Sequence, residues 1–244
     1  MRARANLPCI MRTDASAATR ATHDAMTGGA PADRAAALAP AGVGNIGPGL
    51  DVLGMAVTGP GDRVVAERTA QAGVTMADAG HPDLPRDATR NAAGIAAIAV
   101  LERAGAADLG VQITLEKRLP LSGGQGGSAA SAVAGAVAVN RLLGSPLDAT
   151  ALFECALAAE SKLSGRHGDN LASALFGGVI LVRSLDPVDI VSLPVPPALR
   201  VVLAHPAQRL STADARLVLP RCLERNAAIA QMANFAAMVA AFAS

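Results

Sequence analysis

The stretch from Pro120 to Asn140, PLSGGQGGSAASAVAGAVAVN, constrains the fold most, because a glycine-rich loop runs directly into a run of very small residues. Four glycines within five positions leave almost no Cβ atoms there, so a ligand can approach the backbone N–H groups closely. Ser128 is a favoured N-cap residue, and it precedes a predicted helix over residues 129–143. The N-terminus of such a helix attracts phosphate. The stretch therefore predicts a phosphate-binding loop, with an ordinary glycine-rich turn as the alternative.

The loop lacks the signatures of two widespread phosphate-binding motifs. No lysine follows its glycines as in the Walker motif, and the third glycine of the dinucleotide motif would fall on Ala129. Residues 42–47 do satisfy G-x-G-x-x-G, but a Pro-Gly pair follows at once and prevents a helix from starting there. This second segment is better explained as a turn that presents Asn45 and Asp51. Local turn chemistry alone also explains those two residue types.

The composition restricts the class of protein. Hydrophobic residues make up 51% of the 244 positions but aromatic residues only 2%, so the core must consist of small aliphatic side chains. A net charge of +1 does not indicate the strongly basic surface that binds nucleic acid. The longest apolar run is too short to span a bilayer. Three scattered cysteines indicate neither a zinc site nor a disulfide framework. We therefore expect no nucleic acid or membrane as partner, and a reduced, cytoplasmic setting.

Apolar spacing along the chain predicts a mixed order of strands and helices, which is typical of a two-layer α+β fold. Residues 1–35 show no apolar period and are predicted to be a disordered extension. Strands are predicted over residues 64–68, 111–116, 175–182 and 201–204. Helices are predicted over residues 91–103, 148–162 with Asp148 as N-cap, 211–219 and 223–242.

The glycine-rich loop resembles the ATP loop of the GHMP kinases, a superfamily that includes galactokinase, homoserine kinase and mevalonate kinase. Their pattern is Pro-x-x-x-Gly-Leu-Gly/Ser-Ser-Ser-Ala. Gln125 stands here where Leu or Met is usual, and Gly127 replaces the first of the two serines. The resemblance implies that ATP is bound by Pro120, Gly123, Gly124, Gln125, Gly126, Gly127, Ser128 and Ala129.

Three further motifs narrow the resemblance to the homoserine kinases. The first comprises Pro40, Ala41, Asn45, Ile46, Gly47, Gly49, Leu50, Asp51, Leu53 and Gly54. The second comprises Glu160, Ser164, Gly165, His167, Asp169, Asn170, Ala172, Gly177 and Gly178. The third comprises Ser211, Thr212, Ala215, Arg216, Leu219 and Pro220. Without the resemblance, the polar cluster in the second motif would be interpreted as a solvated loop.

The resemblance implies that ATP phosphorylates L-homoserine to O-phospho-L-homoserine, a step of threonine biosynthesis. Phosphoryl transfer depends mostly on positioning and charge neutralisation. The implied catalytic residues, which orient the attacking hydroxyl group, are Asn170 and Asn45, and His167 is expected to brace its loop. The implied homoserine-binding residues are Asn45, Asp51 for the ammonium group, Asn170, and Arg216 for the carboxylate. The implied ligands of Mg²⁺ are Ser128 and Glu160.

The resemblance also implies a domain organisation. A nucleotide domain like that of ribosomal protein S5 is expected over residues 36–183, and an incomplete C-terminal α/β domain over residues 184–244. Family members continue beyond this point, so the chain is expected to be C-terminally truncated. The final apolar helix then predicts poor solubility or self-association, with a homodimer as one form. The alternatives are another GHMP small-molecule kinase and a non-catalytic homologue that only binds nucleotide.

Overall fold

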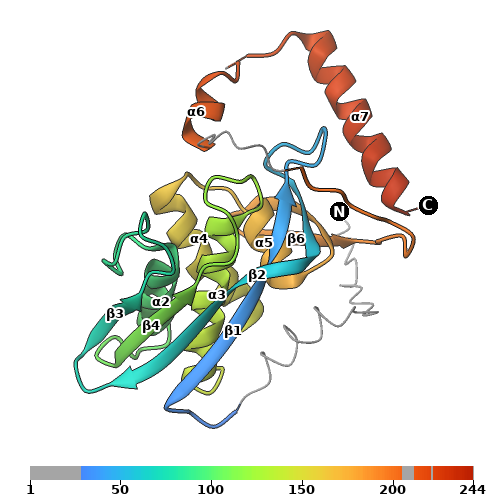
Figure 1. The fold of residues 1–244 in the computed structure, drawn as a ribbon. Coiled ribbons are helices and arrows are strands. Elements are labelled where there is room, and N and C mark those ends of the chain that lie inside the picture. Colours follow the sequence, from blue (N-terminus) through green and yellow to red (C-terminus); the bar gives the residue numbers. More distant parts are fainter. Residues whose placement is uncertain (1–28, 205–211, 221, 244) are drawn as a thin grey trace, which may run out of the picture.

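The structure is a computed structural model that describes residues 29–204, 212–220 and 222–243. It contains a six-stranded sheet with helices against one face (Figure 1). The strands are β1 (Arg34–Gly44), β2 (Leu53–Thr69), β3 (Gly73–Asp78), β4 (Gly110–Glu116), β5 (Val179–Leu185) and β6 (Val188–Leu193). The helices are α2 (Ala92–Arg103), α3 (Gly127–Leu142), α4 (Ala149–Leu163), α5 (Asp169–Phe176), α6 (Thr212–Leu217) and α7 (Arg225–Ala243). The predicted α+β fold class is confirmed.

The long strand β2 holds the sheet together. It pairs with β1 in antiparallel orientation along nearly its whole length. Its second half, residues 63–69, also pairs with β4, and its first three residues pair with β5. The remaining pairings are a parallel one between β3 and β4 and an antiparallel one between β5 and β6. Both halves of the sheet are thus joined through a single strand.

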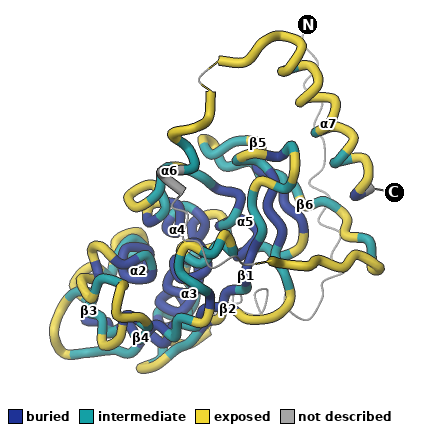
Figure 2. The backbone as a smooth tube through the Cα atoms, turned by 45° about the horizontal axis from the view of Figure 1, so that its top comes forward, coloured by how far each residue is buried: buried dark blue, intermediate teal, exposed yellow. Residues whose placement is uncertain are grey.

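Helix α3 lies at the centre of the helical layer, against β1 and β2 and beside α2 and α4. Only Gly127, Ser128 and Arg141 of this helix are not buried. Such a helix can be buried all round because its residues are so small. A Cβ atom on Gly135 would lie 2.6 Å from the carbonyl oxygen of Ala93 in α2, so the two helices approach closely there. The buried backbone of this layer is dark blue in Figure 2.

Several predicted elements are confirmed. The strands predicted over residues 64–68 and 111–116 lie within β2 and β4, and the helix predicted over 91–103 is α2. Asp148 caps α4 by accepting a hydrogen bond of 2.8 Å from the backbone N–H of Ala151. Helix α3, by contrast, begins one residue before Ser128, at Gly127, with Gly126 as its N-cap. Gly126 adopts the left-handed conformation that glycine accommodates best, so Ser128 is inside the first turn.

Three other predictions differ from the structure. Leu175 and Phe176 end α5 rather than begin a strand, because Gly177 and Gly178 both have positive φ and end the helix before β5. Residues 201–204 form no strand, since no strand of the described chain pairs with them. Residues 29–35 are ordered rather than an extension, because the N–H of Ala32 bonds to the carbonyl of Leu142 and β1 starts at Arg34. Residues 1–28 lie outside the described part.

The last two helices lie outside the sheet layer. Helix α7 stands apart from the helices on the sheet in Figure 1, and most of its residues are exposed (Figure 2). Met238 and Phe242 nevertheless contact the cluster of Met55 and Val179. The domain boundary predicted at residues 183–184 falls inside β5, which pairs with β6. The division of the chain into two domains stays a prediction. No helix among the described residues has the length and apolarity needed to cross a membrane.

Candidate active site

The predicted phosphate loop connects β4 to α3. Positive φ occurs at alternate residues of the loop, at Ser122 (54°), Gly124 (68°) and Gly126 (65°). Backbone in which left-handed residues recur in this way turns N–H groups toward a common concave side, which suits an anion. No side chain caps α3, so the N–H groups of its first turn remain without a capping partner in the described chain. Ala129, the last residue predicted to bind ATP, is buried.

The end of β1 and the start of α5 face this loop. The N–H of Gly42 donates a hydrogen bond of 3.1 Å to the carbonyl oxygen of Gln125. A Cβ atom on Gly126 would lie 2.9 Å from Oδ1 of Asn170, so the Asn170 amide is in direct contact with the loop. Oδ1 of Asn170 is buried and has no hydrogen-bond partner in the described chain. Asn170 is therefore adjacent to the predicted phosphate position.

Hydrogen bonds link α5 to the turn between β1 and β2. The N–H of Asn45 donates to Oδ2 of Asp169 (3.1 Å), and Oδ1 of Asn45 accepts from the N–H of Asp51 (2.8 Å). Asn45 and Asp51 both have positive φ, near 60°, which these residue types tolerate better than most. Burial raises the pKa of Asp169, against the hydrogen bonds it accepts from backbone N–H groups. Asp169, not proposed from the sequence as a site residue, thus holds Asn45 in place.

Asp51 and Arg216 are bound to one another. Nη2 and Nη1 of Arg216 donate to the two carboxylate oxygens of Asp51, at 2.5 and 3.1 Å. This hydrogen-bonded pairing lowers the pKa of Asp51 and raises that of Arg216. Nδ1 of His167 lies 3.4 Å from Oδ1 of Asp51, on the same side of the site. The two residues assigned to opposite charges of one substrate therefore lie within hydrogen-bond distance of each other.

Glu160 lies in the last turn of α4, behind these residues. Burial raises its pKa to about 7; the negative charge of Asp169 adds to this, while Ser164 and Arg216 oppose it. Its Oε2 atom is buried without a hydrogen-bond partner among the described residues. Ser128, the other predicted magnesium ligand, lies in the first turn of α3 and is not hydrogen-bonded to Glu160. Glu160 can therefore accept a cation or a donor.

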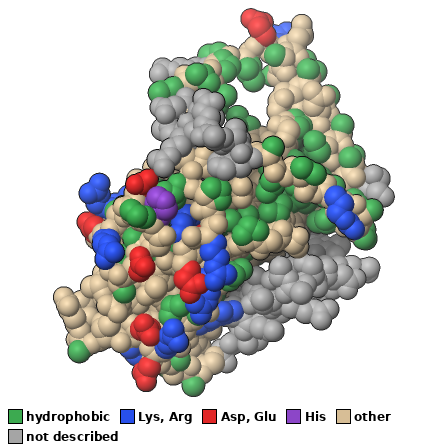
Figure 3. All heavy atoms as spheres, in the orientation of Figure 1, with side chains coloured by type: hydrophobic (Ala, Val, Ile, Leu, Met, Phe, Trp, Pro, Cys, Tyr) green, Lys and Arg blue, Asp and Glu red, His purple; other side chains and the backbone are tan. Residues whose placement is uncertain are grey.

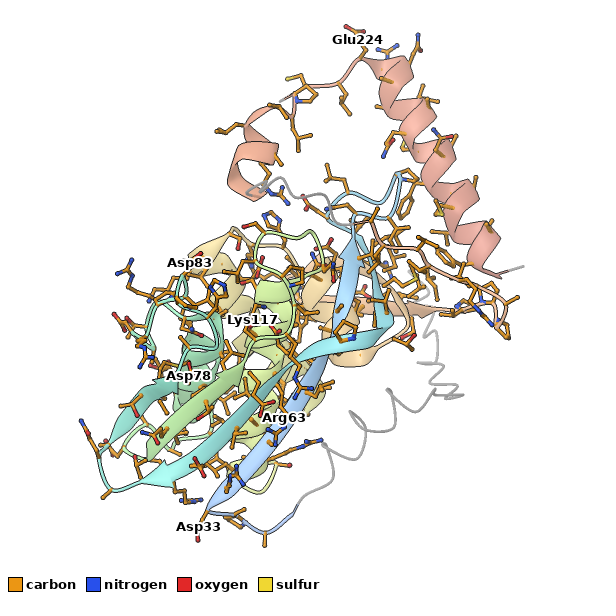
Figure 4. The ribbon with its side chains drawn as sticks, viewed as in Figure 1. Asp33, Arg63, Asp78, Asp83, Lys117 and Glu224 are labelled. Carbon is orange, nitrogen blue, oxygen red and sulfur yellow. The ribbon has the colours of Figure 1, made fainter. Side chains whose placement is uncertain are left out.

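Sequence reasoning missed an ion pair at the base of the loop. Lys117 and Asp62 form a salt bridge in which 5% and 0% of their side chains are exposed, and Ser131 of α3 joins it. Figure 4 labels Lys117 where β4 gives way to the loop. The signal available in the sequence was a lysine three residues before Pro120, at the end of an alternating strand.

Known proteins resemble this chain over most of its length. Residues 91–178, which include the loop and α5, match the model of the GHMP kinases N terminal domain. The homoserine kinase of Chloroherpeton thalassium is 39% identical over 214 residues, which cover 83% of this chain and 67% of that protein. The homoserine kinase of Chlorobium phaeobacteroides is 38% identical over 215 residues. The chain thus spans about two thirds of the length of these relatives.

Solved structures of kinases are also similar to this chain. The crystal structure of homoserine kinase from Cytophaga hutchinsonii superimposes with a TM-score of 0.79 at 39% identity, covering 87% of this chain and 68% of that one. The L. major mevalonate kinase in complex with R-mevalonate has a TM-score of 0.53 at 18% identity, which supports the fold alone. At the identity and coverage found for its relatives, this chain belongs to the homoserine kinase family of the GHMP kinases.

Proposed function

We propose that this chain transfers the γ-phosphoryl group of ATP to the hydroxyl group of L-homoserine. One observation carries the proposal. The buried side-chain polar atoms that have no hydrogen-bond partner within the described chain are Oε2 of Glu160, Oδ1 of Asn170 and Nε of Arg216. Buried polar groups are nearly always satisfied, so unpaired ones require an explanation. All three belong to residues that the family motifs assign to metal, hydroxyl group and carboxylate.

The nucleotide side of the site is made of backbone. The loop from Gly123 to Gly126 and the first turn of α3 would hold the phosphates through N–H groups and the partial positive charge of the helix terminus. No side-chain charge is needed from the loop itself. Under this arrangement Gln125 and Gly127 would still allow nucleotide binding, since neither replacement removes a backbone N–H group.

The substrate side is made of opposite charges. Asp51 would bind the ammonium group of homoserine, and Arg216 would bind its carboxylate through the guanidinium fork. Homoserine would then separate the pair that these residues form with each other. The Nε atom of Arg216, which lacks a partner in the described chain, supplies a further donor for the carboxylate.

The hydroxyl group would be oriented by Asn170, with Asn45 holding the adjacent turn. An amide is not a strong base, so neither Asn170 nor Asn45 is expected to abstract the proton of the hydroxyl group. Catalysis would rest on alignment, and the proton would leave to phosphate or water.

A magnesium ion fits Glu160, because the unpartnered Oε2 atom is an oxygen acceptor of the type Mg²⁺ prefers. No cluster of three or more His, Cys, Asp or Glu in the described part could hold a metal alone. Glu160 and Ser128 would therefore supply few ligands, with phosphate and water completing the shell. When bound, Mg²⁺ neutralises charge that develops on the phosphate oxygens.

The decisive experiment measures ADP release by the purified protein with Mg-ATP, with and without L-homoserine. We expect release that depends on homoserine, fails with mevalonate, and falls by about a hundredfold or more in Asn170→Ala, since a positioning group is lost. Asn226→Ala, the same change at an exposed position in α7, should retain full activity. No ADP with any substrate, from a folded protein that binds nucleotide, would identify a non-catalytic homologue. Release with mevalonate instead would identify another small-molecule kinase.

A further inference from the structure

We propose that Lys117 is the positioning residue of the phosphate loop and that this role needs the space left by the missing side chain of Gly127. The proposal rests on the proposed nucleotide site, but Lys117, Asp62 and Ser131 are not among the residues that the family motifs assign to it. The buried network described above consists of Lys117, Asp62 and Ser131. It lies where the two ends of the loop, after β4 and before α3, come close together.

A single carboxylate holds both ends of the loop. Oδ1 of Asp62 accepts hydrogen bonds of 3.0 Å from the backbone N–H groups of Arg118 and Leu119, at the start of the loop. Oδ2 of Asp62 accepts from the Ser131 hydroxyl group (2.6 Å), in the second turn of α3 after the loop. Asp62 is fully buried in β2, so it anchors both ends to the sheet.

The ammonium group completes the connection at the far end. Nζ of Lys117 pairs with Asp62 and donates a hydrogen bond of 2.9 Å to the carbonyl oxygen of Gly127. That carbonyl belongs to the first residue of α3, directly after the loop. Both charges are buried, so separating the pair would leave each charge buried without a partner, which costs much free energy. The first turn of α3 is therefore fixed before any nucleotide binds.

Gly127 is complementary to this ammonium group. A Cβ atom at Gly127 would lie 2.8 Å from Nζ of Lys117, closer than a methyl group and an ammonium group can approach. The φ of Gly127 is not in the left-handed region, so its backbone does not require glycine. In this structure Gly127 therefore leaves the space that the Lys117 ammonium group occupies.

The consequence for binding is preorganisation. A loop with three glycines loses much conformational entropy when a ligand fixes it, unless the fold has already fixed its ends. The Lys117–Asp62 pair would provide that restraint. Its loss should weaken nucleotide binding and loosen the loop more than it affects homoserine binding.

Gly127→Ala and Lys117→Met test the proposal. Three quantities are measured in each variant: the Kd of ADP by calorimetry, amide hydrogen exchange of residues 121–127 without nucleotide, and the KM values of both substrates. We expect both the Kd of ADP and the loop exchange rate to rise about tenfold, with the homoserine KM changing less than about threefold. Gly29→Ala is the control for added methyl, because nothing lies within 4 Å of its Cβ position. Arg103→Met is the control for loss of a cation, from the exposed pair with Glu154.

The outcomes separate the alternatives. If Lys117→Met does not fold, Gly127→Ala alone decides, since both charges remain in it. An ADP Kd and a loop exchange rate in Gly127→Ala that stay within about twofold of the wild-type values would overturn the proposal, whatever the thermal stability. If the wild-type protein binds no ADP, the proposed function fails, and the exchange rates still decide whether Lys117 holds the loop.

Discussion

Glu160 shows how a single buried side chain links stability to pH. Its pKa of about 7 lies above the ordinary value of 4.5, chiefly because the carboxyl group is buried. A folded-state pKa above the unfolded one means that the folded protein binds the proton more tightly. The stabilising contribution is complete below about pH 4.5 and is lost as the pH rises through about 7. Above pH 7 the folded state must hold a buried carboxylate.

Glu160→Gln should therefore stabilise the metal-free protein at high pH. The amide keeps the shape but does not ionise, so we expect the variant to exceed the wild type by about 2 kcal/mol at pH 8 and to show little difference at pH 5. Urea unfolding in the presence of a chelator measures both values. Parallel pH profiles for the two proteins would exclude this role for Glu160. ADP release by the variant should fall at the same time, because a proposed ligand of Mg²⁺ is lost.

At the level of residues, most of the predicted site residues were identified from short local motifs. Asn170, Asn45 and Asp51 stand in compact motifs, and the structure brings them to one place. The Asp62–Lys117 pair was not predicted, because its partners are 55 residues apart and a lone aspartate in a strand resembles a solvent-exposed one. Burial of a charge depends on the whole fold and leaves no local pattern.

At the level of elements, the contact of β1 with α5 fixes the geometry of the site. A Cβ atom on Gly44, the last residue of β1, would lie 2.3 Å from Oδ2 of Asp169 and 2.7 Å from Nδ2 of Asn170. Asp169 cannot easily move away from an added methyl group, since its side chain is buried and accepts a hydrogen bond from Asn45. Helix α5 would have to move away from β1.

Gly44→Ala should thus damage both stability and catalysis. We expect a loss of about 1–3 kcal/mol from overpacking, and a fall in kcat because Asn170 moves with its helix. Chemical unfolding and ADP release measure the two effects. Gly29→Ala adds the same methyl group in open space and should leave both unchanged. A Gly44→Ala protein with wild-type kcat would mean that α5 does not need this contact.

Elements with a strong local signal were predicted well, and elements that depend on a partner were not. Helices α2 and α4 had clear caps and apolar spacing, and both formed as expected. The apolar residues 201–204 have the composition of a strand, but a strand forms only where an edge is available to pair with it. Strand β6 was not predicted from the sequence, and in the structure it pairs with β5 in antiparallel orientation.

At the level of the whole molecule, the segment after β6 exposes much apolar surface. Large hydrophobic side chains there are exposed, and Val202, Leu217 and Val218 are more than four-fifths exposed. Figure 3 shows hydrophobic side chains gathered on and below α7 on this face of the molecule. Exposed apolar patches of this kind favour association.

The protein is therefore expected to self-associate as its concentration rises. Gel filtration with light scattering over a wide concentration range should show an apparent mass that increases with concentration. Substitution of Val202 and Val218 by Ser should shift the distribution toward the monomer, because both side chains are exposed and support no core. A single sharp monomer peak at every concentration would refute this expectation.

The mutual pairing of Asp51 and Arg216 implies selection for zwitterions under the proposed function. An amino acid replaces one ion pair by two, so both side chains exchange a partner and no charge is left alone. An amino alcohol would release Arg216 without a partner, and a hydroxy acid would release Asp51. Charge symmetry would therefore exclude such analogues before the position of their hydroxyl group is tested. The Asp51–Arg216 pair is in this respect a competitor within the protein, and each ligand has to displace it.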